Sequence, residues 1–144
     1  MKRFIEVRSA DGGPPEMAAA LAALWKGLFY DAEALEGALQ LLQGYSMAQR
    51  VEMQQAAAQD AHKGHGNGFH LGELARELVK LSREGLTRLS AGTADETHHL
   101  NPLQAIVDSG ETLADRLVAE FGAGPFDDKT RRALMSRSSI VAAS

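Results

Sequence analysis

The chain has 144 residues, which suits one compact domain, and its 44% hydrophobic content is enough to form a core. The formal net charge of −4 argues against a nucleic-acid surface, and no apolar run reaches the length of a membrane span. The absence of cysteine excludes disulfides and thiolate chemistry within these residues. We therefore expect a cytoplasmic protein with no nucleic-acid or membrane partner.

The first fourteen residues predict a β-strand followed by a Gly-Gly-Pro turn. Strand alternation places Ile5 and Val7 on one face, with Glu6 and Arg8 on the other about 6.5–7 Å apart. That face suits a metal on one residue and a phosphate or carboxylate on the next, although a solvated edge strand explains the same pattern. No second convincing strand follows. Because a lone strand cannot pair its backbone groups, the chain is either a fragment or needs a partner.

The next sixty residues predict helices and one glycine-rich loop. A helix over residues 15–30 is followed by one capped by Asp31 and ended by Gly44, and a capping box at residues 46–49 opens a third toward residue 61. The expected buried residues of the first two helices are Leu21, Leu24, Trp25, Leu28, Leu35, Leu39 and Leu42. Residues 62–70 hold three glycines and predict a flexible loop.

Residues 71–89 form the clearest amphipathic helix, with an apolar side made by Leu71, Leu74, Ala75, Leu78, Leu81, Leu86 and Leu89. After a loop over residues 90–99, Asn101 is expected to cap a helix that stops at Gly110. A further helix starts at residues 112–115, and Asp127 or Asp128 caps a last one through residue 135. The prediction is a mainly α fold divided into a strand and turn (1–14), a helical region (15–135) and a frayed tail (136–144).

Several stretches of this sequence are similar to motifs of one known enzyme family. Residues 3–14, Arg-Phe-Ile-Glu-Val-Arg-Ser-Ala-Asp-Gly-Gly-Pro, are similar to a strand of the form "(K/R)-aromatic-(I/L)-E-(V/M)-R-x-x-D" and the turn after it. Residues 24–31, Leu-Trp-Lys-Gly-Leu-Phe-Tyr-Asp, are similar to an "F-W-x-G-L-L-Y-D" segment. Further stretches recur in the same order at residues 74–78, 82–86, 95–96, 100–103 and 106–110. Together these stretches resemble glutamate–cysteine ligases of the plant and proteobacterial type.

The resemblance implies the C-terminal region of a larger α+β ligase with a glutamine synthetase-like active-site sheet. Such an enzyme phosphorylates the glutamate side-chain carboxylate with ATP, and the cysteine amine then displaces phosphate. Glu6 would bind Mg²⁺, and Arg8 would contact phosphate or substrate as the catalytic and ATP-binding residue. The implied partners are glutamate, cysteine, ATP and the N-terminal remainder of the ligase.

Other side chains offer weaker candidates for a site. Trp25 and Tyr30 match family positions, but aromatic residues on an apolar helical stripe usually belong to a core. His62, His65 and His70 could hold a transition metal, although a solvated loop is favoured, and His98 and His99 are expected to diverge. A non-catalytic helical protein, or a remnant that pairs with a separate ligase chain, remains the alternative. In either case we expect the isolated chain to be inactive.

Overall fold

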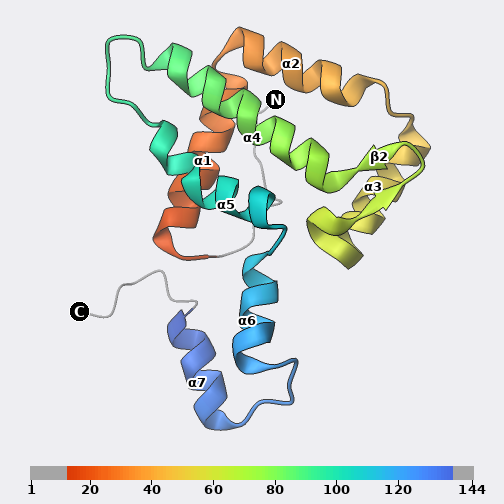
Figure 1. Ribbon diagram of the computed structural model, residues 1–144, viewed down its shortest axis with the longest axis vertical. Coiled ribbons are helices and arrows are strands. Elements are labelled where there is room, and N and C mark those ends of the chain that lie inside the picture. The colour runs from red at the N-terminus through yellow and green to blue at the C-terminus, as the bar shows by residue number, and fades with distance from the viewer. Residues whose placement is uncertain (1–12, 138–144) are drawn as a thin grey trace, which may run out of the picture.

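A computed structural model describes residues 13–137 of the chain (Figure 1). The order of elements is α1 (Pro15–Phe29), α2 (Ala32–Gln43), α3 (Met47–Asp60), η1 (Ala61–Lys63), β1 (His65–Gly66), β2 (Phe69–His70), α4 (Leu71–Leu89), η2 (Thr97–Leu100), α5 (Asn101–Ser109), α6 (Leu113–Phe121) and α7 (Asp128–Arg137). The mainly α prediction is confirmed for this part of the chain. The predicted N-terminal strand lies outside the described residues.

The contact between α1 and α4 organises the body of the molecule. The two helices approach so closely that a Cβ on Gly27 would collide with the backbone of Ser82, and one on Gly85 would collide with the backbone of Gly27. The Ser82 hydroxyl donates to the carbonyl oxygen of Leu24 at 3.0 Å. Only residues without long side chains allow two helix backbones to meet in this way. We call this contact, made by Gly27, Ser82 and Gly85, the α1–α4 joint.

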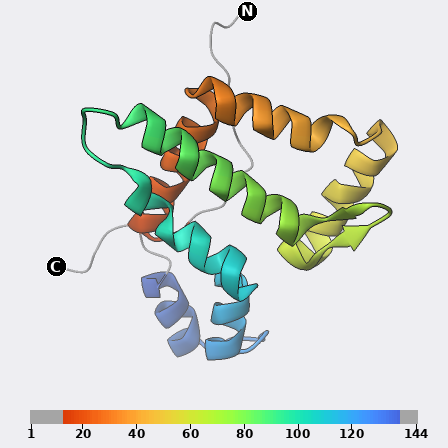
Figure 2. The same ribbon diagram turned by 45° about the horizontal axis from the view of Figure 1, so that its top comes forward.

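The apolar core lies beside this joint. Ala23, Leu86 and Leu100 form a buried cluster, and Leu24 and Leu103 pack against it. Leu100 ends η2, so α5 follows directly from a residue with no exposed surface. On the other side of α4, α2 runs alongside it (Figure 2). The core is therefore assembled from helices far apart in the sequence.

Residues 65–70 form a short β-hairpin that follows the turn η1, so the prediction of a flexible loop over residues 62–70 was wrong. β1 pairs antiparallel with β2, with His65 opposite His70 and Gly66 opposite Phe69. Phe69 is buried, and Gly68 adopts φ 83°, a conformation that favours glycine. The sequence held the signal for this turn, because Asn-Gly between two short strands is a common hairpin connection.

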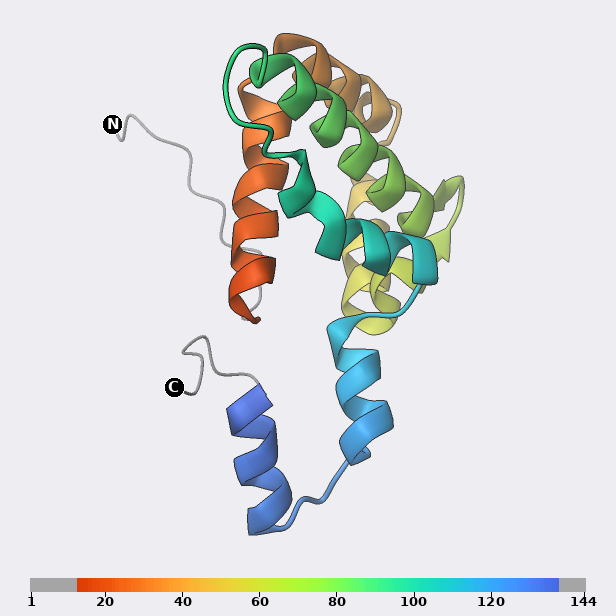
Figure 3. The same cartoon turned by 60° about the vertical axis from the view of Figure 1, so that its left-hand side comes forward.

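Helices α6 and α7 project from one end of the body (Figure 3). We call residues 113–137 the α6–α7 arm. Thr112 and Asp115 form the capping box that opens α6, with the Thr112 hydroxyl accepting from the backbone N–H of Asp115 at 3.0 Å. Neither helix contains a buried residue. The arm's helices are therefore fixed by local capping more than by burial.

The helix limits in the structure agree well with those predicted from the sequence, whereas the predicted buried residues agree less well. Helix α4 has the predicted limits, and Asp31 and Ser46 cap α2 and α3 as expected. Leu39, expected inside, is 55% exposed. The buried positions of α1 are Ala20, Ala23, Gly27 and Leu28. Burial of Leu28 was predicted, and the other three are small residues that let α1 lie close to α4.

Two helix ends also differ from the prediction. Asn101 is the first residue of α5 and not its cap, because η2 runs directly into the helix and leaves Leu100 at the cap position. Its side-chain oxygen accepts instead from the Arg83 guanidinium at 3.3 Å. Asp127 is the acid that caps the last helix, accepting from the backbone N–H of Thr130 at 2.7 Å, and α7 continues to Arg137.

Candidate functional site

The two predicted site residues, Glu6 and Arg8, lie outside the described residues. Gly13 is the first residue that the structure describes, and it joins their segment to α1. A Cβ on Gly13 would lie 3.3 Å from the Cβ of Met17 and 3.7 Å from Cδ1 of Leu113. The base of α1 therefore touches α6, and this is where the predicted site segment enters the body.

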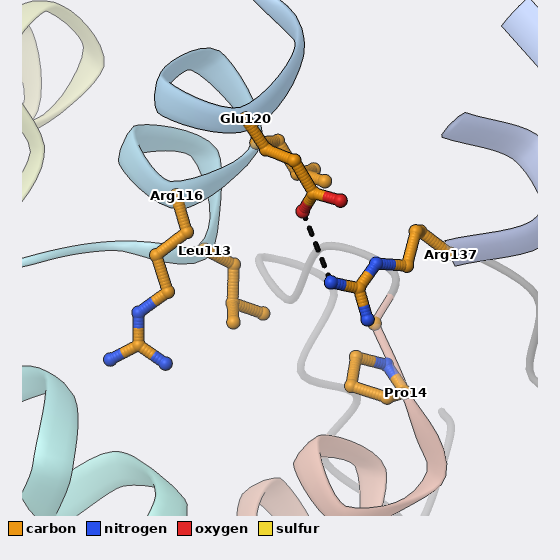
Figure 4. A pocket seen from close by; sticks show the side chains of 7 residues that line it. Pro14, Leu113, Arg116, Glu120 and Arg137 are labelled. Atoms are coloured by element: carbon orange, nitrogen blue, oxygen red, sulfur yellow. Dashed lines mark hydrogen bonds and ion pairs between the residues drawn. The ribbon is translucent and has the colours of Figure 1, made fainter. Parts of the chain in front are cut away.

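A surface cavity of about 290 Å³ lies at this entry point. It is lined by Gly13, Pro14, Leu113, Arg116, Leu117, Glu120 and Arg137. Figure 4 shows Arg137 extending from α7 toward Glu120 on α6, with Pro14 below the pair. Leucine and proline side chains make its wall apolar, and charged groups stand at its edge.

The charged groups of this cavity are paired within the chain. Arg137 Nη2 lies 3.1 Å from Glu120 Oε2, and Arg116 Nε lies 3.3 Å from Glu111 Oε2. All four side chains are well exposed, so each pair contributes little to stability. Because each guanidinium already faces a carboxylate, the cavity is not a preformed anion site. The cavity is relevant to the predicted site because it lies beside Gly13, which follows the segment with Glu6 and Arg8 in the sequence.

The histidines are brought partly together by the hairpin. The rings of His65 and His70 stack across the two strands with centroids 6.2 Å apart. Both ring nitrogens of His62 are buried without a hydrogen-bond partner. Residues 13–137 contain no group of three histidine, aspartate or glutamate side chains placed to hold a metal. The rings of His98 and His99 lie 4.0 Å apart, so the prediction that they diverge was wrong.

The two aromatic residues at family-like positions have different environments. Trp25 is half-buried and stacks on Phe29 with ring centroids 5.0 Å apart. Its indole Nε1 is buried without a hydrogen-bond partner. Tyr30 is 78% exposed, so it does not belong to the core that its spacing predicted. These aromatic side chains form a patch on the outside of α1.

Three basic residues in the family-like stretches bind other elements of the fold. Arg76 Nη2 donates to the carbonyl oxygen of Val107 at 3.0 Å, which fixes α5 against α4. Arg83 Nη1 donates to the carbonyl oxygen of Thr97 at 3.0 Å. Lys26 Nζ lies 2.7 Å and 2.8 Å from the two carboxylate oxygens of Glu96. Spacing along the sequence could not reveal these partners, because each contact joins different elements.

Asp31 has the most perturbed ionisation in this part of the chain. Hydrogen bonds from the Arg88 guanidinium, followed by that from the backbone N–H of Ala34, lower the pKa of its carboxyl group from 3.8 to about 2. Arg88 Nη2 lies 2.6 Å from Oδ1 of Asp31, and Nε lies 3.0 Å from Oδ2. The carboxylate caps α2 and ties it to the end of α4. Its perturbation therefore has a structural cause.

No helix within the described residues is long and apolar enough to cross a membrane. The predicted absence of a nucleic-acid partner stays a prediction.

Comparisons with known proteins agree with the resemblance found in the sequence. The model of the family "Glutamate-cysteine ligase family 2(GCS2)" matches residues 1–136. The chain is 32% identical over 118 residues to glutamate–cysteine ligase A of Oryza sativa subsp. indica, covering 82% of this chain and 23% of that protein. The ligases of Nicotiana tabacum and Arabidopsis thaliana are also 32% identical over 118 residues, with 22% of each covered.

The chain thus spans less than a quarter of the length of the curated relatives it matches. The names of these relatives describe them as chloroplastic, which does not fit the cytoplasmic location expected for this chain.

Proposed function

The chain belongs to the glutamate–cysteine ligase family 2, and we propose that it forms the C-terminal, helical part of an ATP-dependent ligase that makes γ-glutamylcysteine, the first step toward glutathione. The observation that carries this proposal is the family match through residues 1–136, because it includes the segment with Glu6 and Arg8. The substrates of the proposed reaction are glutamate, cysteine and ATP.

The chemistry requires activation of a poor electrophile. A side-chain oxygen of glutamate attacks the γ-phosphorus of ATP, and ADP leaves with the electrons of the broken P–O bond. The cysteine amine then attacks the acyl carbon, inorganic phosphate leaves, and the amine loses a proton. Catalysis of such steps depends on positioned cations that stabilise charge on the phosphoryl oxygens.

Glu6 and Arg8 have side chains suited to this chemistry. A carboxylate offers the hard oxygen that Mg²⁺ prefers, and a guanidinium offers a planar, permanent cation for phosphate. Mg²⁺ would neutralise phosphate charge when it is bound. Mg²⁺ normally needs several oxygen ligands in an octahedral array, and Glu6 is the one candidate ligand that the resemblance assigns to this chain. For this reason we expect the isolated chain to be inactive.

The proposal is tested in a full-length ligase that contains this region. Glu6→Gln keeps the shape of the side chain but removes its charge, so its loss of turnover should ease as Mg²⁺ is raised. Arg8→Lys keeps the positive charge but loses the planar guanidinium, which can donate two parallel hydrogen bonds. Its loss of turnover should therefore persist at any Mg²⁺ level and correspond to about 3–4 kcal/mol of transition-state stabilisation. Steady-state kinetics over a Mg²⁺ series measures both effects.

Glu16→Gln is the matched control, because Glu16 is an exposed carboxylate in the first turn of α1. It should leave turnover and thermal stability near those of the unmodified enzyme. Near-normal turnover of either site variant would remove Glu6 or Arg8 from the proposed site. Release of ADP by the pure 144-residue chain, dependent on both glutamate and cysteine, would contradict the inactivity expected of it.

A further inference from the structure

His62 is a titratable side chain whose ring has no polar partner within the described residues. It is the middle residue of η1, and both nitrogens of its ring are buried without a hydrogen bond. A neutral imidazole has one N–H donor and one acceptor nitrogen, so burial leaves both unsatisfied. An unsatisfied polar group destabilises a fold, which makes a ring held in this position a candidate for a conformational role.

The ring of His62 lies against the junction between the body and the α6–α7 arm. A Cβ on Gly110 would be 3.4 Å from Nε2 of His62, so the ring faces the residue at which α5 ends. Gly110 has φ 68°, a left-handed conformation that favours glycine and lets the chain change direction. Helix α6 begins shortly after it, where the arm leaves the body (Figure 3). His62 therefore contacts the point about which the arm would turn.

The backbone of η1 is fixed to the body. The carbonyl oxygen of Gly64 accepts from the N–H of Leu71 at 2.9 Å, and a Cβ on Gly72 would lie 3.0 Å from the carbonyl oxygen of His62. Ala61, the residue before His62, has φ 49°, which residues other than glycine rarely adopt. The contacts with the start of α4 thus hold η1 and its ring in place despite a strained backbone.

A second contact from η1 reaches the arm. Lys63 Nζ lies 3.4 Å from Oδ2 of Asp115, and the same oxygen accepts from the backbone N–H of Thr112 at 2.8 Å. Hydrogen bonds from the backbone and then the hydroxyl of Thr112, together with the nearby Lys63 ammonium, lower the pKa of the Asp115 carboxyl from its ordinary 3.8. This contact therefore keeps its charges through the range in which histidine side chains titrate.

We propose that protonation of His62 releases the α6–α7 arm from η1. The imidazolium is a cation with two N–H donors, and in the buried position of this ring neither donor has an acceptor. A buried charge without a partner is far less stable than the same charge in water. Uptake of the proton therefore requires the ring to reach water, which parts it from Gly110 and opens the junction.

The elements around the ring offer no carboxylate that compensates its charge in place. Their ionisable side chains near these contacts are Asp60 of α3, His70 of β2, Glu73 and Arg76 of α4, Asp108 of α5, Glu111, and Asp115 of α6. None of them forms a hydrogen bond with either ring nitrogen. Asp108 accepts from Gln104 at 3.0 Å, and Glu111 lies 3.3 Å from Arg116, so both acids have other partners. Only the open state binds the extra proton, so opening increases as pH falls and the closed junction is most stable at neutral pH and above.

Opening of the junction also affects the cavity beside Gly13. Leu113 and other residues of the arm line this cavity together with Gly13 and Pro14 at the base of α1. Release of the arm therefore opens the cavity, at the point where the segment with Glu6 and Arg8 joins the body. This link to the site rests on the proposed function, whereas the pH response of the arm does not.

Amide hydrogen exchange in the 144-residue chain measures release of the arm directly. One proton bound only in the open state raises the equilibrium constant for opening by up to about tenfold per pH unit. After correction for the intrinsic pH dependence of exchange, the amides of α6 should lose protection by about tenfold or more between about pH 7 and about pH 5. Amides of α4, such as that of Leu86, should keep their protection because that residue lies in the core.

Variants of His62 identify the group that responds. His62→Phe keeps a ring but cannot take up a proton, and His62→Gln tests the same point with a polar side chain. In both, arm protection should no longer depend on pH. His65→Gln is the matched control, since His65 is an exposed histidine of the neighbouring strand β1, and it should respond to pH as the unmodified chain does. Lys63→Met removes the ion pair and should lower arm protection by a similar factor at both pH values.

Equal arm protection at the two pH values in the unmodified chain would overturn the proposal, as would a pH response that survives in both His62 variants. The ring resonances of His62 provide a second measurement that needs no substitution. If NMR showed the ring taking up its proton while arm protection stayed constant, ring and arm would not be coupled. Circular dichroism confirms that each variant keeps its helices. Because exchange needs no substrate, it can fail while the kinetics of the Glu6 and Arg8 variants succeed, and the reverse.

Discussion

The α1–α4 joint and the α6–α7 arm are both helical, but different forces hold them in place. At the joint, small residues let two backbones touch, and buried side chains such as Leu86 and Leu100 surround the contact. In the arm, α6 carries a capping box and a clear apolar stripe but no buried residue. An exposed ion pair, with Lys63 Nζ 3.4 Å from Asp115 Oδ2, links it to the body.

This difference shows that local helix signals and tertiary stability are separate properties. Capping and amphipathic spacing predict that a helix exists, and they predict α6 as well as α4. Most of a helix's stability in a protein comes from packing of its apolar face, which α4 has and α6 lacks among the described residues. The arm should therefore open locally before the body unfolds.

The largest expected effect comes from truncating a leucine in each region. Leu86→Ala should lower the free energy of unfolding by about 2–5 kcal/mol, because Leu86 is 1% exposed and leaves a cavity in the core. Leu117→Ala in the arm should cost less than about 1 kcal/mol, since that side chain is only half-buried. Chemical denaturation of both variants measures the difference. If the two variants lost equal free energies of unfolding, the arm would unfold together with the body.

A glycine pair tests whether the helix backbones truly touch at the joint. Gly85→Ala should destabilise the protein by about 1–3 kcal/mol, because the new Cβ meets the backbone of Gly27, which cannot move like a side chain. Gly44→Ala is the matched control, with φ −71° and no atom within 4 Å of the added Cβ. It should be neutral or stabilise by about 0.4–1 kcal/mol. If Gly85→Ala left the midpoint of thermal unfolding unchanged, α1 and α4 would have to lie farther apart than the structure shows.

The smallest expected effect concerns the pH dependence of the Asp31–Arg88 pair at the edge of the body. Asp31→Asn keeps a good helix cap but removes the charge, so it should cost less than about 1 kcal/mol near neutral pH. The carboxyl pKa is about 2 when folded and 3.8 ordinarily, so the pair stabilises the protein fully above pH 3.8. The difference between wild type and variant should shrink as pH falls from 3.8 to about 2. A difference independent of pH would exclude the charged pair as its cause.

The candidate site was predictable from the sequence only as a strand motif. The spacing of Glu6 and Arg8 predicts one strand face suited to metal and phosphate, and this stays a prediction, although the family match includes that segment. The cavity beside Gly13 could not be predicted, because its walls come from α1, α6 and α7. Trp25 was expected inside the core and is only half-buried. Spacing along α1 could not reveal this, because it does not tell which side of the helix the other helices cover.

The sequence alone was enough to predict the mainly α fold, most helix limits and the caps at Asp31 and Ser46, because these depend on neighbours within one turn. For the last helix it left Asp127 and Asp128 as alternatives, and Asp127 is the cap. The tertiary structure decided which faces are buried, placing small residues such as Gly27 and Gly85 at the centre and leaving Leu39 and Tyr30 outside. It also decided the partners of Arg76, Arg83 and Arg88. These outcomes depend on contacts between residues far apart in the chain, and periodicity along one helix carries no information about them.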